Sequence, residues 1–135
     1  NNLVASMLAQ EGLELVRNIR DENWLNEDEH STYDDDIYTG ADTTFAIDDY
    51  DYFRNSIDYS PNTIDDSETE LYYYEDRGLY THDNTLPNTT DTIVRRIIEV
   101  TQPSSEYLIV TARVQWKTNN RTGEYVATTY LYDLR

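Results

Sequence analysis

A long amphipathic segment at the start of the chain, residues 2–25, limits the fold more than any other feature of the sequence. Its apolar residues recur at spacings close to the α-helical period, namely Val4, Leu8, Leu15 and Ile19. The pattern predicts one helix, roughly 35 Å long. A helix of this length either lies along a whole sheet or projects from the body of the domain.

The predicted helix has apolar residues on more than one face. Leu3 and Met7 lie off the main apolar stripe. Two interpretations stay open: a wide stripe that faces the protein's own core, or a second face that packs on other subunits. The residues expected to act in packing or assembly are Val4, Met7, Leu8, Leu15, Val16 and Ile19.

The C-terminal half has the alternation of apolar and polar residues that is typical of strands. Strands are expected at Leu71–Tyr74, Thr92–Val100, Glu106–Lys117 and Glu124–Asp133. Asn and Gly residues within 118–123 predict a hairpin turn between the last two strands. The sequence therefore predicts an α+β fold, in which the N-terminal helix packs on a C-terminal antiparallel sheet of three to four strands.

The middle of the chain, residues 26–69, is acidic, rich in tyrosine and broken by Gly40 and Pro61. We expect mostly loop there, with a short strand at Thr43–Ile47. The length of 135 residues suits a single domain, 1–135, made of a helix (1–25), this loop region and a sheet (70–135).

Negative charge is concentrated in one part of the chain. The net charge is −17, and residues 26–91 carry 19 acidic and 2 basic side chains. Residues 92–135 have six basic and four acidic side chains, a small positive balance. An acidic surface repels phosphate backbones, so no nucleic-acid partner is expected there. The chain has no cysteine, which excludes disulfides and thiolate zinc sites.

The helix also carries a specific motif. Leu8-Ala9-Gln10-Glu11 is followed by Arg17-Asn18-Ile19-Arg20-Asp21. This arrangement resembles the lower half of the long helix in type IV pilin-like proteins. The segments 71–81, 93–100, 107–117 and 125–134 are similar to the same family, and residues 26–69 lie outside the resemblance.

The resemblance implies a structural subunit of an extracellular, cell-surface filament rather than an enzyme. Its partners would be other pilin subunits. A hydrophobic segment of about 25 residues upstream of Asn1 would hold the subunit in the inner membrane before assembly. A type II secretion pseudopilin would fit the same features. The chain departs from many classical pilins in lacking a cysteine pair, and it does not include the upstream half of the helix.

The acidic clusters offer an alternative role as a Ca²⁺- or glycan-binding surface module. Asp34, Asp36, Asp49 and Asp51 are weak candidates for Ca²⁺ ligands, because carboxylate oxygens suit this cation. They do not form a standard calcium-binding loop, and a solvated acidic face is the simpler interpretation. The tyrosines of the same region could form a contact surface or a local core.

No catalytic residue is predicted. The two histidines, His30 and His82, lie in polar segments and are expected at the solvated surface. No serine has the glycine pattern of a nucleophile elbow. No firm cofactor follows from the sequence.

Overall fold

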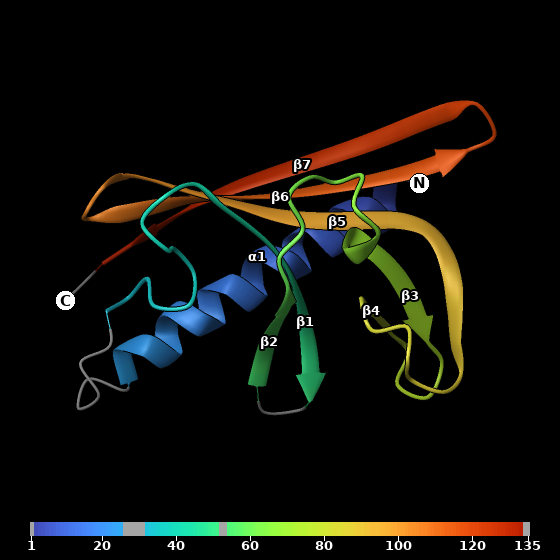
Figure 1. The fold of residues 1–135 in the computed structure, drawn as a ribbon, viewed down its shortest axis with the longest axis horizontal. Helices are drawn as coiled ribbons and strands as arrows, with labels where there is room; N and C mark the ends of the chain where they lie inside the picture. Colours follow the sequence, from blue (N-terminus) through green and yellow to red (C-terminus); the bar gives the residue numbers. More distant parts are fainter. Residues whose placement is uncertain (1, 26–31, 52–53, 134–135) are drawn as a thin grey trace.

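The computed structural model describes residues 2–25, 32–51 and 54–133. It describes the side chains of these residues except those of 49–51 and 54–59. One long helix, α1 (Asn2–Leu25), comes first (Figure 1). Within these residues it is followed by seven strands: β1 (Thr43–Asp51), β2 (Arg54–Tyr59), β3 (Glu70–Tyr74), β4 (Leu79–Thr81), β5 (Thr89–Ser104), β6 (Tyr107–Thr118) and β7 (Arg121–Tyr132). The predicted α+β class, with an N-terminal helix on an antiparallel sheet, is confirmed, but the sheet has more strands than the three to four expected.

The long strand β5 organises the sheet. Along one edge it pairs with β6, from Val94 to Ser104. Along the other edge it pairs with two short strands in turn, β3 near its start and β1 at Ile98–Val100. All pairings are antiparallel, and β7, β2 and β4 are each joined to a single neighbour among the described strands.

The middle of the chain is more ordered than the sequence suggested. The expected short strand at Thr43–Ile47 lies within β1, which extends to Asp51, and β2 forms a hairpin with it. The expectation of mostly loop is therefore wrong for these residues. Acidic residues are poor strand formers on average, but cross-strand pairing and burial override that preference here.

The turn between β6 and β7 is tighter than predicted. Thr118 pairs with Arg121, so the connection is Asn119-Asn120 alone, and Asn119 has a positive φ of 49°. Asn tolerates this conformation better than most residues. Gly123 was expected in the turn but lies within β7, where it pairs with Trp116.

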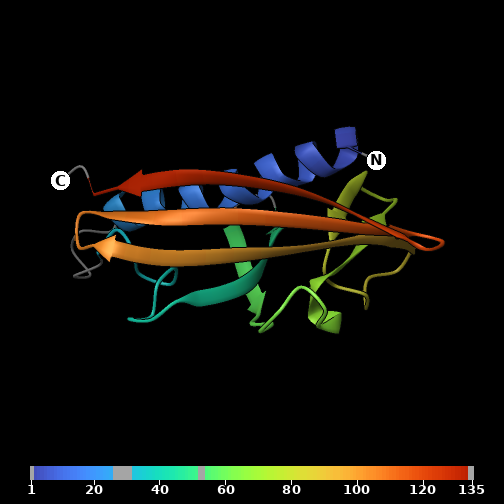
Figure 2. The same cartoon turned by 90° about the horizontal axis from the view of Figure 1, so that it is seen from above.

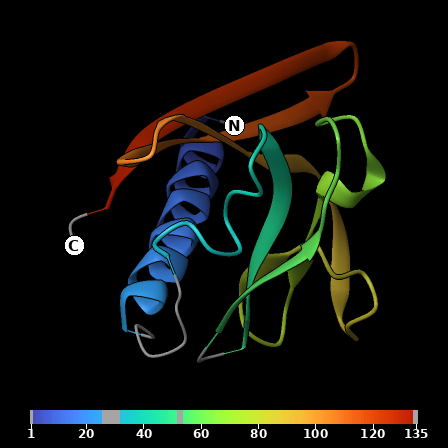
Figure 3. The ribbon, with the colours of Figure 1, turned by 60° about the vertical axis from the view of Figure 1, so that its left-hand side comes forward.

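The core forms between α1 and one face of the sheet (Figures 2 and 3). The alternation along β6 places its inward residues in this core as predicted, namely Leu108, Val110, Ala112 and Val114. The helix contributes a buried stripe that includes Leu8 and Val16, both fully inaccessible. Each such side chain stabilises the fold by about 1.5–3 kcal/mol relative to exposure. No described helix is both long and apolar enough to cross a membrane.

Candidate functional site

The helix residues singled out from the sequence divide into two groups. Four of them are buried against the protein's own sheet: Leu8, Leu15, Val16 and Ile19. Val4 is half-buried and packs against the same core. Met7 is different, because 53% of its surface is exposed, and the neighbouring Leu3 is 79% exposed. Leu3 and Met7 therefore leave apolar surface available to another molecule near the N-terminus of the helix, and Leu25, at its other end, is 85% exposed.

We call Leu3 and Met7 the outer apolar face of α1. They lie four positions apart, so they share one side of the helix. The same side continues into polar residues, Gln10 and Glu14, which are exposed. Figure 2 shows that α1 crosses beneath β7 and that its N-terminal turns lie beyond this strand. The apolar part of the exposed face is thus at the end of the helix that projects past the sheet.

A buried arginine fastens α1 to the sheet. Arg96, on β5, is completely inaccessible to solvent. Its Nη1 atom donates to the carbonyl oxygen of Leu8 at 2.9 Å and to the carboxylate of Glu11 at 2.8 Å, and its Nη2 atom donates to the carbonyl oxygen of Ile47 at 2.8 Å. One side chain therefore links the helix, β5 and β1.

Gly12 provides the space for this arginine. A Cβ atom at Gly12 would lie 3.0 Å from Cδ1 of Ile98 and 3.3 Å from Cδ of Arg96. Both distances are tighter than ordinary carbon contacts. The glycine in the middle of the predicted helix is thus a packing requirement of the helix–sheet contact, not a break in the helix.

A second buried pair lies beside Arg96. Nδ1 of His82 is 2.7 Å from Oδ1 of Asp48, and the backbone N–H of His82 and the hydroxyl of Thr81 also donate to this carboxylate. Burial alone would raise the pKa of Asp48. The hydrogen bonds from His82 and the electrostatic effects of His82 and Arg96 outweigh it, so the pKa lies below the ordinary Asp value.

The position of His82 corrects the sequence-based expectation. It was expected at the solvated surface, yet only 5% of its surface is exposed. It follows β4 directly, and Asp48 on β1 supplies the acceptor that makes burial tolerable. His30 lies outside the described residues. Since Asp48, His82 and Arg96 are all shielded from solvent, this cluster serves to join β1, β4, β5 and α1.

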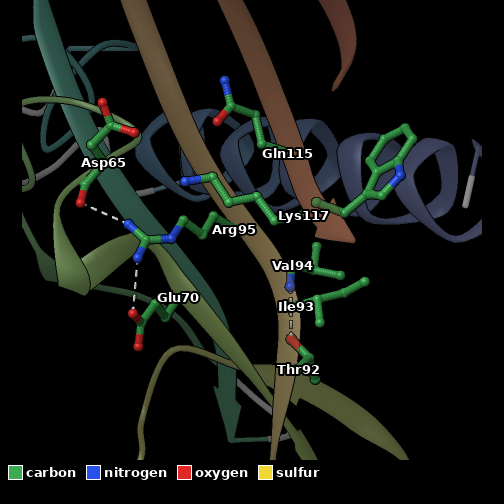
Figure 4. Close-up of a pocket in the computed structure, with 9 residues that line it drawn as sticks. Asp65, Glu70, Thr92, Ile93, Val94, Arg95, Gln115 and Lys117 are labelled. Atoms are coloured by element: carbon green, nitrogen blue, oxygen red, sulfur yellow. Dashed lines mark hydrogen bonds and ion pairs between the residues drawn. The ribbon is translucent and has the colours of Figure 1, made fainter. Parts of the chain in front are cut away.

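The described chain has a pocket of about 490 Å³ on the outer side of the sheet (Figure 4). Its floor comes from β5 and β6, and Asp65 and Glu70 lie on its rim. Arg95 is fixed there, because it donates to the carbonyl oxygen of Asp65 at 2.7 Å and to the carboxylate of Glu70 at 3.0 Å. The remaining lining residues are Thr92, Ile93, Val94, Gln115, Trp116 and Lys117.

The acidic residues considered for Ca²⁺ come from two segments of the chain, the turn that contains Asp34 and Asp36 and the strand β1. Asp34 accepts hydrogen bonds from Thr32 and Gln102, and Asp36 is exposed in a turn with a φ of 64°. Asp49 and Asp51 are in β1, and their side chains lie outside the described part. Among the side chains that the structure describes, no group of three or more His, Asp or Glu could hold a metal ion.

Sequence reasoning missed Arg96 and Asp48. A signal for Arg96 was present, because it occupies the inward-facing parity of β5 together with Val94, Ile98 and Val100. An arginine among inward β-branched residues indicates a buried, paired cation. Asp48 gave no comparable signal, since its partners are 33 or more residues away.

A comparison of the chain with protein-family models, curated proteins and solved structures finds no match.

Proposed function

We propose that this chain is the head of a subunit of an extracellular, type IV pilus-like filament. The observation that carries the proposal is the construction of α1: one side is buried in the sheet, and the outer apolar face, Leu3 and Met7, projects past β7. Apolar residues exposed together on one side of a helix indicate a contact with another chain. In this role α1 joins neighbouring subunits, and the sheet faces outward.

The buried attachment of α1 also supports an assembly role. A helix that carries subunit contacts has to keep a fixed orientation relative to the head. Arg96 bonds to the backbone of both α1 and β1, and Asn23 donates to the carbonyl oxygens of Tyr33 at 3.1 Å and Asp35 at 2.8 Å. The helix is therefore held near its middle and near its C-terminal end.

The first test is the coding sequence upstream of Asn1. The proposal expects a short basic leader, a small residue at a cleavage site and about 25 apolar residues that run into α1. Such a subunit would be anchored in the inner membrane before assembly and located at the cell surface afterwards. An unrelated domain directly upstream would contradict the proposal.

The second test concerns the outer apolar face. Met7→Glu and Leu3→Glu place charges where another subunit would pack, and they should abolish filaments seen by electron microscopy of the native host. Gln10→Glu, at an already polar position of the same helix side, is the matched control. The isolated domain should keep its melting temperature in all three variants, because these positions are exposed. If the chain is instead a secretion pseudopilin, the Met7→Glu and Leu3→Glu variants should lose protein secretion, and the parent should form no surface filaments.

Sugar binding is a second candidate, favoured by the outer pocket. Neither the carboxylate of Asp65 nor the ammonium of Lys117 forms a side-chain hydrogen bond or ion pair within the described residues, and both line the pocket. Unpaired polar groups beside the exposed Ile93 suit a neutral, hydroxyl-rich ligand. NMR titration with neutral oligosaccharides should shift Lys117 and Ile93 signals, and the shifts should disappear in Lys117→Ala. If no NMR signal shifts at millimolar sugar, sugar binding at this pocket is contradicted.

A further inference from the structure

A tripeptide pattern that accepts N-linked sugars occurs twice in the sequence. In this pattern an asparagine is followed, two positions later, by serine or threonine, and the residue between them is not proline. The two sites are residues 88–90, Asn-Thr-Thr, and residues 120–122, Asn-Arg-Thr. Because so short a pattern often arises by chance, the surroundings of each site in the fold decide whether it can serve as an acceptor.

The transfer reaction needs a free amide and a free hydroxyl at the acceptor site. The amide nitrogen of the asparagine attacks C1 of a sugar that is attached to a lipid-linked phosphate. The N–C1 bond forms as the C1–O bond breaks, the lipid phosphate leaves with the electron pair, and the amide gives up one proton. The transferase recognises the hydroxyl group two residues later, which is why only serine or threonine serves there.

The site at Asn120 meets both requirements. Asn120 is the second residue of the two-residue turn between β6 and β7, and it is exposed together with Arg121 and Thr122. Within the described part of the chain, neither the amide of Asn120 nor the hydroxyl of Thr122 has a hydrogen-bonding partner. Figures 1 and 2 show that the tip of this hairpin lies at one end of the molecule, where a second protein can reach it.

The site at Asn88 meets neither requirement, although it is also exposed. The amide of Asn88 donates to the carboxylate of Asp76 at 3.0 Å, and the hydroxyl of Thr90 donates to the carboxylate of Glu75 at 3.2 Å. Hydrogen bonds to carboxylates are stronger than those between neutral groups, and both have to break before transfer. The same carboxylates repel the phosphate of the sugar donor.

We propose that Asn120 is a site of N-linked glycosylation, which accepts an oligosaccharide from a lipid-linked phosphate donor. The inference rests on the extracellular location in the proposed function, because exported proteins receive this modification. A bulky, hydrated sugar at the tip of the β6–β7 hairpin keeps this end of the sheet in solvent and out of subunit contacts.

Mass spectrometry of the chain isolated from the surface of its native host tests the site directly. Chymotrypsin cleaves after Trp116 and Tyr125, so the peptide 117–125 contains Asn120 and no other part of either site. This peptide should carry the mass of a sugar chain, and the peptide that contains Asn88 should have the mass of its amino acids alone. A sugar on the Asn88 peptide instead would overturn the assignment.

Substitutions within the two sites separate the acceptor from its surroundings. Asn120→Gln and Thr122→Ala should both remove the added mass, whereas Thr122→Ser keeps the hydroxyl and should retain it. Asn88→Gln is the matched control and should leave the added mass unchanged. Since Asn120 and Thr122 are exposed, their variants should keep the melting temperature of the parent, so that a loss of sugar cannot be attributed to unfolding.

The failure of this inference differs from the failure of the proposed function. If the chain is found in surface filaments and its 117–125 peptide carries no sugar, glycosylation at Asn120 is wrong while the filament role stands. If the chain is found only inside the cell and carries no sugar, both are wrong.

Discussion

Arg96 donates a hydrogen bond of 2.9 Å to the carbonyl oxygen of Leu8, which joins the middle of β5 to the backbone of α1. The guanidinium has no exposed surface, so this bond and the bond to Ile47 form in an environment from which water is excluded, whereas the side chain of Glu11, the third partner, is 39% exposed. Hydrogen bonds that involve a charge in such surroundings are strong, and the loss of one partner leaves the other unsatisfied.

We expect Arg96→Met to destabilise the fold by about 3–5 kcal/mol, because it leaves the Ile47 carbonyl group and the Asp48 carboxylate without their buried cation. Urea denaturation followed by circular dichroism measures this change. Arg121→Met, at an exposed arginine of β7, should change the free energy of unfolding by no more than about 0.5 kcal/mol. Equal effects of both substitutions would contradict the role given to Arg96.

Gly12 should not tolerate a large side chain. Gly12→Leu would drive its side chain into Ile98 and Arg96, and overpacking of this kind costs about 1–3 kcal/mol in spite of the better helix propensity of leucine. Gln10→Leu places the same side chain at an exposed position of α1 and should leave the melting temperature nearly unchanged. A Gly12→Leu protein as stable as the parent would mean that α1 can move away from β5.

The buried carboxylate of Asp48 predicts a dependence of stability on pH. Its pKa in the folded protein is lowered, so its contribution is complete above the unfolded-state pKa of about 4 and is lost as the pH falls through the lower folded-state value. At pH 7, Asp48→Asn should cost about 3 kcal/mol.

Other carboxylates also titrate in this range, so the useful quantity is the difference between parent and Asp48→Asn. The difference in free energy of unfolding should shrink as the pH is lowered below 4 and should be constant between pH 5 and 7. A difference that does not change with pH would show that Asp48 keeps an ordinary pKa. Asp42→Asn, at an exposed aspartate, provides the control.

Gly123 should be required for the position of Trp116. A Cβ atom there would lie 2.1 Å from Cε2 of the Trp116 indole, so Gly123→Ala has to displace the ring. We expect a loss of about 2 kcal/mol and a shift of the tryptophan emission maximum. Because Trp24 also emits, the measurement is made in a Trp24→Phe background. Thr122→Ala, beside Gly123 but exposed, should leave the emission unchanged.

Local periodicity was a sound guide where one face of an element meets the core. The stripe of α1 that contains Leu8, and the alternation of β6 that contains Leu108, follow from the sequence alone because burial repeats at the period of the element. The assignment of Leu3 and Met7 to a separate face follows in the same way. These patterns were sufficient for the fold class and for the order of helix and sheet.

Long-range pairing was the part that the sequence did not reveal. The acidic residues around Asp48 indicated a loop, since a carboxylate can enter a strand interior only when distant groups satisfy it. His82, 34 residues later, supplies that partner. For the same reason the strands β1 and β2 were underestimated, and His82 was placed at the surface. A single sequence offers no means to match such partners.

The bond between Arg96 and Leu8 spans 88 positions of the chain. During synthesis, α1 leaves the ribosome long before β5 exists, and its buried stripe has no sheet to cover it. The two hairpins of β5, β6 and β7 bring together neighbours in sequence and can form quickly, whereas the closure of α1 onto them is a late, non-local step. The first element to be made is thus among the last to reach its place, and until then the apolar stripe of α1 has no sheet to cover it.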